Sequence, residues 1–404
     1  MLARLLRWAC KVGGIDEAIA AIRDGRRRGR IGTSVVIRSA LLLFLTRLGS
    51  LNALEQTRSS ARWRRWLGAD LPSADTLGRV MADIELETLR GAIGDLYRNL
   101  KRGKALQATA GGLVALVIDG HQSYSTYHRR CGGCLERRVK TKAGYRTQYY
   151  HHWVVAMLLS RPIPMLLDLE SLRTGEDEIT AAVRLLERIL LRFPRAFDVV
   201  VADALYSDTR IYRLLCAHHK DVISVLKANT PELLEEANDL VRWESPAAGS
   251  TPEYQLWDVA SGIDWPAAKA PLRFLRLVET RQVRRQLDQK KETLLSHWMW
   301  MTTLSPNRAS TTVAVTLARA RWDIENLGFN ETVRRWHIDH VYRHHPIAMT
   351  AFWLLGALAY GVFHAFYHRG LKPALQQRGS YLHLARCLAA ELYARPDAAR
   401  PPPS

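Results

Sequence analysis

Two short apolar runs, each followed by an aspartate, constrain the fold of this chain most. The run Leu113–Ile118 precedes Asp119, and the run Val199–Ala202 precedes Asp203. Runs that are apolar throughout and bounded by polar residues are typical of strands buried on both faces. An aspartate that directly follows such a strand should project at the carboxyl edge of the sheet. The pattern therefore predicts an α/β fold with two acidic side chains at strand ends.

A third acidic residue, Glu325, lies in the helical stretch Arg321–Asn326. Carboxylates are hard oxygen ligands for Mg²⁺, and two such ions can clamp both the attacking and the leaving oxygen of a phosphate. Two carboxylates at strand ends and one on a helix are what a two-metal phosphoryl-transfer site needs. We therefore identify Asp119, Asp203 and Glu325 as candidate catalytic residues and metal ligands.

Each of these residues also has a structural interpretation. Asp119 and Asp203 could simply end their strands in turns. Asp208 competes with Asp203, although it is also placed to cap a helix N-terminus. Asp323 and Glu331 compete with Glu325, which could also form a surface pair with Arg321. The sequence favours the first set because both aspartates directly follow their apolar strands.

The charge balance indicates a polyanionic partner. The 404 residues include 58 Lys and Arg against 39 Asp and Glu, which gives a net charge of +19 and a pI near 10.0. A pI this high over a whole chain favours nucleic acid, with an anionic membrane surface as the weaker option. The 5 cysteines show no disulfide framework, which suits a reducing cytoplasm. The N-terminus lacks a clean apolar segment followed by a small-residue cleavage site, so we expect a cytoplasmic, nucleoid-associated protein without a signal peptide.

One apolar segment, residues 346–367, is nearly long enough to span a bilayer. It contains His364 and two glycines and lies directly after the stretch that carries Glu325. We therefore expect a buried core helix and no membrane partner.

The order of elements predicts an RNase H-like mixed-sheet core with a β-rich insertion and an N-terminal helical domain. Expected strands at 113–119, 148–160 and 163–171 are followed by helix 176–193, strand 198–202, helix 208–218 and strand 222–226. The predicted ranges are a helical, DNA-binding region at 1–110, the first part of the core at 111–229, the insertion at 230–305, the glutamate helix and a core helix at 306–370, and a C-terminal helix with a disordered tail at 371–404. The first range fits a helix-turn-helix or a helical bundle with a basic face.

Five stretches in this order resemble the DDE transposases of bacterial insertion sequences, in the branch with a β-rich insertion before the catalytic glutamate. They are Val117–His121, Tyr149–His151, Gly175–Glu178, Val201–Ser207 and Arg321–Asn326. The resemblance implies an RNase H-like fold, two Mg²⁺ ions, and Asp119, Asp203 and Glu325 as ligands. It implies cleavage of double-stranded DNA at element ends, joining to target DNA, and a homodimer in the DNA complex.

The chain departs from the family pattern around the glutamate. Ala318 stands where the family has a tyrosine, and Thr332 and Val333 stand near the family's lysine, with Arg334 and Arg335 as the closest cations. These departures concern contacts to the DNA ends more than the metal ligands. They leave two alternatives open: a decayed transposase that only binds DNA, and a nuclease of the same fold.

Basic residues near the predicted active site are candidate DNA contacts. They are Arg129, Arg130, Arg137, Arg138, Lys140, Arg321, Arg334 and Arg335. Backbone phosphates are the partners that such cations bind.

The same basic segment contains His128, Cys131 and Cys134. These side chains could be three of the four ligands of a Zn²⁺ ion, with His151 or His152 as the fourth. Only one cysteine pair is present, so the sequence favours a glycine-rich tight loop with two free thiols. His340, His344 and His345 are interpreted as structural or phosphate-facing.

Overall fold

The computed structural model describes the chain except residues 28, 61, 143, 261–263, 285–290 and 394–404, so the predicted disordered tail lies outside the described residues. The chain forms two compact units. The first unit comprises Met1–Gln107, Gly120–Asp177 and Glu325–Ser404, and the second comprises Ala108–Asp119 and Glu178–Ile324. Because each unit combines separate stretches, the units do not coincide with the consecutive ranges predicted from the sequence.

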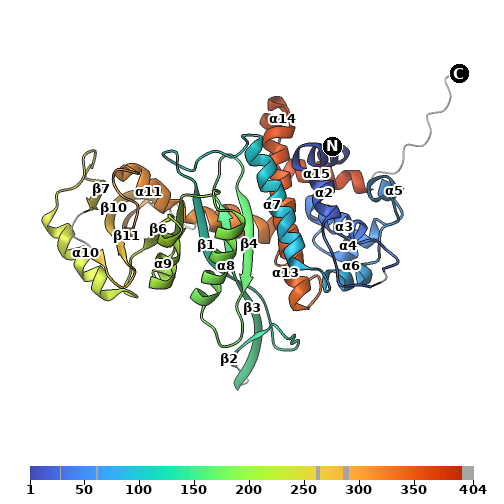
Figure 1. Ribbon diagram of the computed structural model, residues 1–404, viewed down its shortest axis with the longest axis horizontal. Helices are drawn as coiled ribbons and strands as arrows, with labels where there is room; N and C mark the ends of the chain where they lie inside the picture. Colours follow the sequence, from blue (N-terminus) through green and yellow to red (C-terminus); the bar gives the residue numbers. More distant parts are fainter. Residues whose placement is uncertain (28, 61, 143, 261–263, 285–290, 394–404) are drawn as a thin grey trace. The chain divides into compact units, whose positions relative to one another are not determined.

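The N-terminal stretch of the first unit is helical, as predicted. Ser73 caps one of its helices, because its hydroxyl accepts a hydrogen bond from the Thr76 backbone N–H. The helices are α1 (Leu2–Trp8), the π-helical η1 (Ala9–Gly13), α2 (Ile15–Ala20), α3 (Thr33–Leu45), α4 (Leu51–Gln56), α5 (Arg62–Leu67), α6 (Ala74–Met81) and α7 (Leu86–Arg102) (Figure 1).

The C-terminal stretch of the first unit contains its core helix, α13 (Pro346–Ala365), which packs against α3, α7 and a strand of the same unit, β4 (Met165–Ser171). In the described chain it is the one helix long and apolar enough to cross a membrane, yet 89% of that apolar window is buried inside the protein. A helix that is apolar on all sides and buried in this way is a core helix, as predicted. Around it lie α12 (Asn330–Trp336), η4 (Phe366–Gly370), α14 (Pro373–Arg378) and α15 (Tyr381–Tyr393).

Close packing along α13 leads to a first prediction. A Cβ atom on Gly356 would lie 2.7 Å from Ile338 Cγ1 and 3.4 Å from Phe44 Cε1. We expect Gly356→Ala to destabilise the protein by about 1–2 kcal/mol, since the overpacking outweighs the helix propensity gained. Thermal unfolding should show a lower midpoint. Gly361→Ala is the control, because its nearest neighbour is the flexible end of Leu96 at 3.0 Å; an equal loss in both variants would contradict the packing argument.

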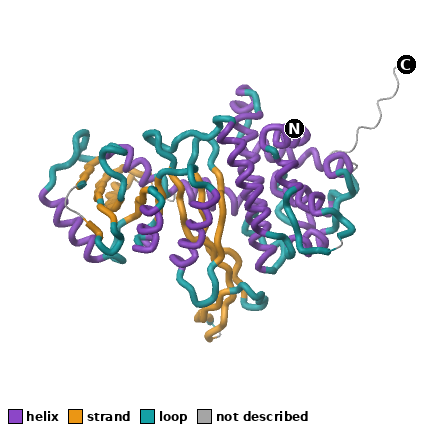
Figure 2. The backbone as a smooth tube through the Cα atoms, viewed as in Figure 1, coloured by secondary structure: helices purple, strands orange, loops and turns teal. Residues whose placement is uncertain are grey.

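The strands of the first unit form an antiparallel group around β3 (Gly144–Leu158). β3 pairs with β2 (Leu135–Thr141) through Gly144–Tyr150 and with β4 through Trp153–Leu158. Figure 2 shows the β2–β3 hairpin extending away from the helices of the same unit. β2 was not predicted, because its sequence is largely polar and exposed and so lacks the apolar run that marks a buried strand.

The second unit is built on a mixed sheet, which confirms the predicted α/β class. The strand order is β1-β5-β6-β11-β10-β7, in which the first three strands are parallel and the later pairs antiparallel. The strands are β1 (Ala115–Thr126, whose residues from Gly120 onward belong to the first unit), β5 (Val199–Ala202), β6 (Asp221–Val225), β7 (Tyr254–Val259), β10 (Arg273–Arg284) and β11 (Lys291–Thr302). Helices α8 (Glu178–Arg192), α9 (Thr209–Ala217) and α11 (Thr311–Arg319) complete the unit's α/β order.

The region predicted as a β-rich insertion, residues 230–305, also contains a helix, α10 (Pro231–Trp243). The prediction of a β-rich insertion did not include this helix. Its strands are not a separate sheet, because β11 pairs with β6 through Trp300 and Val225. Only the short β8 (Asp264–Trp265) and β9 (Ala270–Pro271) form a second, two-stranded sheet in the described part of the region.

Candidate active site

Asp119 and Asp203 lie just beyond the parallel pairing of two neighbouring strands. Asp203 directly follows β5, whereas β1 continues beyond Asp119 to Thr126, so the prediction that Asp119 would end its strand was wrong. The register pairs Val117 of β1 with Val201 of β5, and each aspartate follows two residues later. Because equal steps along parallel strands keep the same register, the two aspartates lie at the same end of the parallel part of the sheet. Their side chains are 20% and 35% exposed, respectively, above a strand core with almost no exposure.

A cation accompanies each aspartate. Arg321 Nη1 lies 3.5 Å from Asp119 Oδ2, and Lys227 Nζ lies 3.4 Å from Asp203 Oδ1. The Arg321 side chain is only 7% exposed and lies over the Trp322 ring at 4.1 Å. Each cation balances part of the negative charge of the aspartate beside it. Arg321 was predicted to contact DNA, and its burial beside Asp119 instead turns it toward the carboxylates.

A third carboxylate, Glu178, belongs to the same group within the second unit. The buried Tyr206 donates a hydrogen bond from its hydroxyl to Glu178. Burial raises the pKa of Tyr206 well above its ordinary value, and the negative charges of Glu178, Asp119 and Asp203 raise it further. Three carboxylates thus surround one neutral phenol. Such a concentration of negative charge with oxygen ligands suits a hard divalent cation.

The sequence analysis assigned no role to Glu178 or Tyr206. Glu178 is the first residue of α8, and Tyr206 follows Asp203 by three positions in a 3₁₀ turn. The stretches that contain them were recognised as part of the family resemblance. Their contact joins residues 28 positions apart, and only the fold reveals it.

Glu325 lies in a π-helical segment, η3 (Ile324–Phe329), and not in the regular helix that was expected. π-helical segments are rare and occur frequently at functional sites. The Glu325 side chain is half-buried. Glu325 is the first residue of the last stretch of the first unit, whereas Asp119 and Asp203 belong to the second unit.

Two rival carboxylates have structural roles. Asp208 caps α9, because its side chain accepts a hydrogen bond of 2.8 Å from the Arg210 backbone N–H. Glu331 is buried, and its carboxylate lies 3.6 Å from the guanidinium of Arg47. These partners explain both residues without a part in metal binding.

Most of the predicted DNA contacts are exposed cations. Arg129 and Arg130 lie in the loop before β2, and Arg137, Arg138 and Lys140 lie on β2 itself. Several stack on tyrosines of β3: the guanidinium of Arg137 lies 4.7 Å from the Tyr150 ring, and that of Arg138 lies 5.3 Å from the Tyr145 ring. We call residues 135–158 the basic hairpin. Arg334 and Arg335 are exposed on α12.

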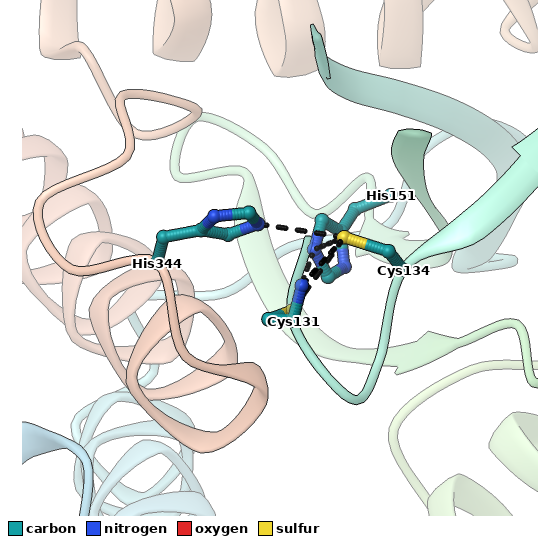
Figure 3. A group of neighbouring side chains, drawn as sticks. All are labelled: Cys131, Cys134, His151 and His344. Atoms are coloured by element: carbon teal, nitrogen blue, oxygen red, sulfur yellow. Dashed lines mark hydrogen bonds between the residues drawn. The ribbon is translucent and has the colours of Figure 1, made fainter. Parts of the chain in front are cut away.

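A second group of side chains gathers within the first unit: Cys131, Cys134, His151 and His344, shown in Figure 3. Burial lowers the pKa of His151 to about 4 and raises that of Cys131 to about 11. His151 had been named as an alternative fourth ligand, and His344 had been interpreted as structural or phosphate-facing. His128, named with the cysteines from the sequence, is exposed and outside this group.

Comparison with known proteins gives one clear match. A family model described as a transposase DDE domain matches residues 115–362, which is more than half of the chain. The matched range contains Asp119, Asp203 and Glu325 as well as the Cys/His group. No curated protein matches the chain.

Proposed function

This chain belongs to the transposase DDE domain family, and on that premise we propose that it cuts the ends of an insertion element and joins them to target DNA by two-metal phosphoryl transfer. In this proposal the core is RNase H-like, and residues 230–305 are the insertion that precedes the catalytic glutamate. The protein acts on double-stranded DNA as a homodimer in the cytoplasm, associated with the nucleoid.

The observation that carries the proposal is that Asp119 of β1 and Asp203 after β5 lie at the same level, just beyond the parallel pairing of the two strands. Glu178 and Tyr206 add a third carboxylate and a phenol to the same edge. The donor set is entirely oxygen, which suits Mg²⁺ and not a softer metal. Asp119 and Asp203 would hold the ions, and Glu325 is proposed as the remaining ligand.

When bound, the ions would activate a water and stabilise the charge that develops on the phosphate. The hydrogen bond from Tyr206 orients Glu178, and the raised pKa of Tyr206 keeps the donated proton on the phenol. Arg321 and Lys227 lie beside the two aspartates, so they can balance negative charge there as phosphate oxygens arrive.

The direct test uses the full-length protein and DNA that carries both flanks of its own gene. We expect Mg²⁺-dependent cuts at the element ends and then covalent joining of the freed 3′-hydroxyl to a second DNA. Cleavage without joining would favour a nuclease of the same fold. Binding without either reaction would favour a decayed transposase that only occupies DNA.

The basic hairpin provides a separate prediction about DNA binding. The exposed Arg138 on β2 should contact backbone phosphate, so Arg138→Gln should weaken binding to any DNA sequence. In a plot of the logarithm of the association constant against the logarithm of the salt concentration, the negative slope should become shallower by about 0.9 for the loss of one phosphate contact. Arg242→Gln is the matched control, because Arg242 is an exposed arginine that pairs with Asp239 on α10 of the other unit. An unchanged salt slope in Arg138→Gln would remove the hairpin from the DNA interface.

A further inference from the structure

Four of the six distances between ligand atoms of the Cys/His group are close to those around a tetrahedral metal ion. The two sulfurs lie 3.6 Å apart, and each lies 3.4 Å from His151 Nε2. His344 Nε2 lies 3.4 Å from Cys134 Sγ, and all four ligand atoms lie within 4.8 Å of one another. Around tetrahedral zinc, sulfurs are about 3.8 Å apart and sulfur–nitrogen pairs about 3.6 Å apart, given Zn–S and Zn–N bond lengths of about 2.3 and 2.05 Å.

The chain builds the cysteine pair with a tight turn. The Cys134 backbone N–H donates to the Cys131 carbonyl at 3.1 Å, and the Cys131 N–H donates to Cys134 Sγ at 3.3 Å. Gly133 allows the turn to approach its neighbours, because a Cβ there would lie 3.0 Å from Pro346 Cβ and 3.6 Å from His151 Cε1.

Neighbouring aromatic rings hold the two histidines in place. His151 stacks on Trp153, with ring centroids 5.6 Å apart and an angle of 14° between the rings. His344 meets Tyr124 edge to face at 5.0 Å. Cys134 and His151 are 6% and 4% exposed. These contacts orient the ligand nitrogens toward the sulfurs in Figure 3, which is the pre-organisation that metal sites need.

We propose that Cys131, Cys134, His151 and His344 bind one structural Zn²⁺ ion. Two thiolates and two imidazoles complete a closed tetrahedral shell without an open position, which is typical of a structural and not a catalytic zinc site. Both cysteines would bind as thiolates and release their protons to solvent.

The site would link distant parts of the first unit. Cys131 and Cys134 precede the basic hairpin, His151 lies on β3, and His344 lies just before α13. Cys134 and His344 are 210 positions apart. A bound ion would therefore hold the base of the basic hairpin against the start of the core helix, and would stabilise the folded state by closing a long loop. This inference does not depend on the phosphoryl-transfer assignment.

The test measures the metal content of the full-length protein. The protein is purified under reducing conditions, without chelators, from cells grown with added zinc, and is analysed by mass spectrometry for metals. We expect about one zinc per chain. A thiol-blocking mercurial should release this zinc, and its release should lower the unfolding temperature. Substoichiometric zinc, or a disulfide between Cys131 and Cys134 in the purified protein, would overturn the proposal.

Variants test each part of the site. Cys134→Ser and His344→Asn should lose the zinc, whereas His128→Asn, which alters an exposed histidine beside the loop, should retain it. Gly133→Ala should weaken zinc binding, and Gly132→Ala should not, because a Cβ on Gly132 meets open space. Full zinc in His344→Asn would contradict the ligand set.

Cobalt provides a readout that does not depend on how the variants fold. Wild-type protein stripped of zinc and reloaded with Co²⁺ should show the visible absorption of a tetrahedral site with thiolate ligands. A spectrum of octahedral cobalt with oxygen ligands would contradict the site. Mg²⁺-dependent DNA cleavage, measured on the same samples, separates failure of this site from failure of the proposed transposase activity.

Discussion

Asp203→Asn will reduce Mg²⁺-dependent DNA cleavage by on the order of 10³-fold or more and leave DNA binding intact. The substitution keeps the size of the side chain and its hydrogen bond of 2.7 Å from the Ala204 N–H, but it removes a negative ligand from the proposed metal site. Single-turnover cleavage of element-end DNA measures the loss, and binding of the same DNA without Mg²⁺ provides the comparison.

Asp208→Asn is the matched control for this experiment. Asp208 lies five positions later and caps α9 through the Arg210 N–H. Asparagine caps helices about as well as aspartate, so this variant should keep both its stability and its cleavage rate. If Asp208→Asn lost activity and Asp203→Asn kept it, the assignment of the strand-end aspartates would be wrong.

Glu331→Ala will destabilise the first unit by about 3–5 kcal/mol, because it leaves a buried cation without its carboxylate. Glu331 lies 3.6 Å from Arg47, and both side chains are less than 10% exposed. The Arg47 guanidinium lies over the Trp336 and Phe363 rings at 4.5 and 4.9 Å. Water therefore has little access to solvate this guanidinium once the carboxylate is removed. Chemical or thermal unfolding should show the change.

A double variant separates the charge pair from packing. In Arg47→Met with Glu331→Gln neither charge remains, so we expect a smaller loss of stability than in Glu331→Ala alone. If Glu331→Ala unfolded at the wild-type midpoint, the buried pair would not contribute to stability.

Glu325→Gln should differ from Glu331→Ala in both measurements: DNA cleavage should be lost, and the unfolding midpoint should stay nearly unchanged.

Sequence patterns predicted the elements whose signal is local. The run before Asp119 is the buried first part of β1, the run before Asp203 is β5, and the periodic segment after residue 176 is α8. The apolar stretch after Pro346 is the buried helix α13. These predictions hold because burial imposes a repeat of two or 3.6 residues, or a continuous apolar run, that is visible along the chain.

Elements without such a signal were missed. β2 is polar on both faces and forms a strand because it pairs with β3. The helix α10 was hidden in a region whose later segments predicted strands. The π-helical turn at Glu325 depends on the packing around η3, and a helical pattern in sequence does not distinguish it from an α-helix.

The sequence by itself determined which residues carry the chemistry: acidic side chains after apolar strands, a basic surface, and a Cys-x₂-Cys pair. The tertiary structure alone decided which of them meet. It brought Glu178 and Tyr206 to the two aspartates, chose His151 and His344 over His128 for the cysteines, and buried Arg47 with Glu331. Local periodicity reports whether a side chain is buried, but a partner up to 210 residues away is set by how the elements pack, and no local pattern encodes it.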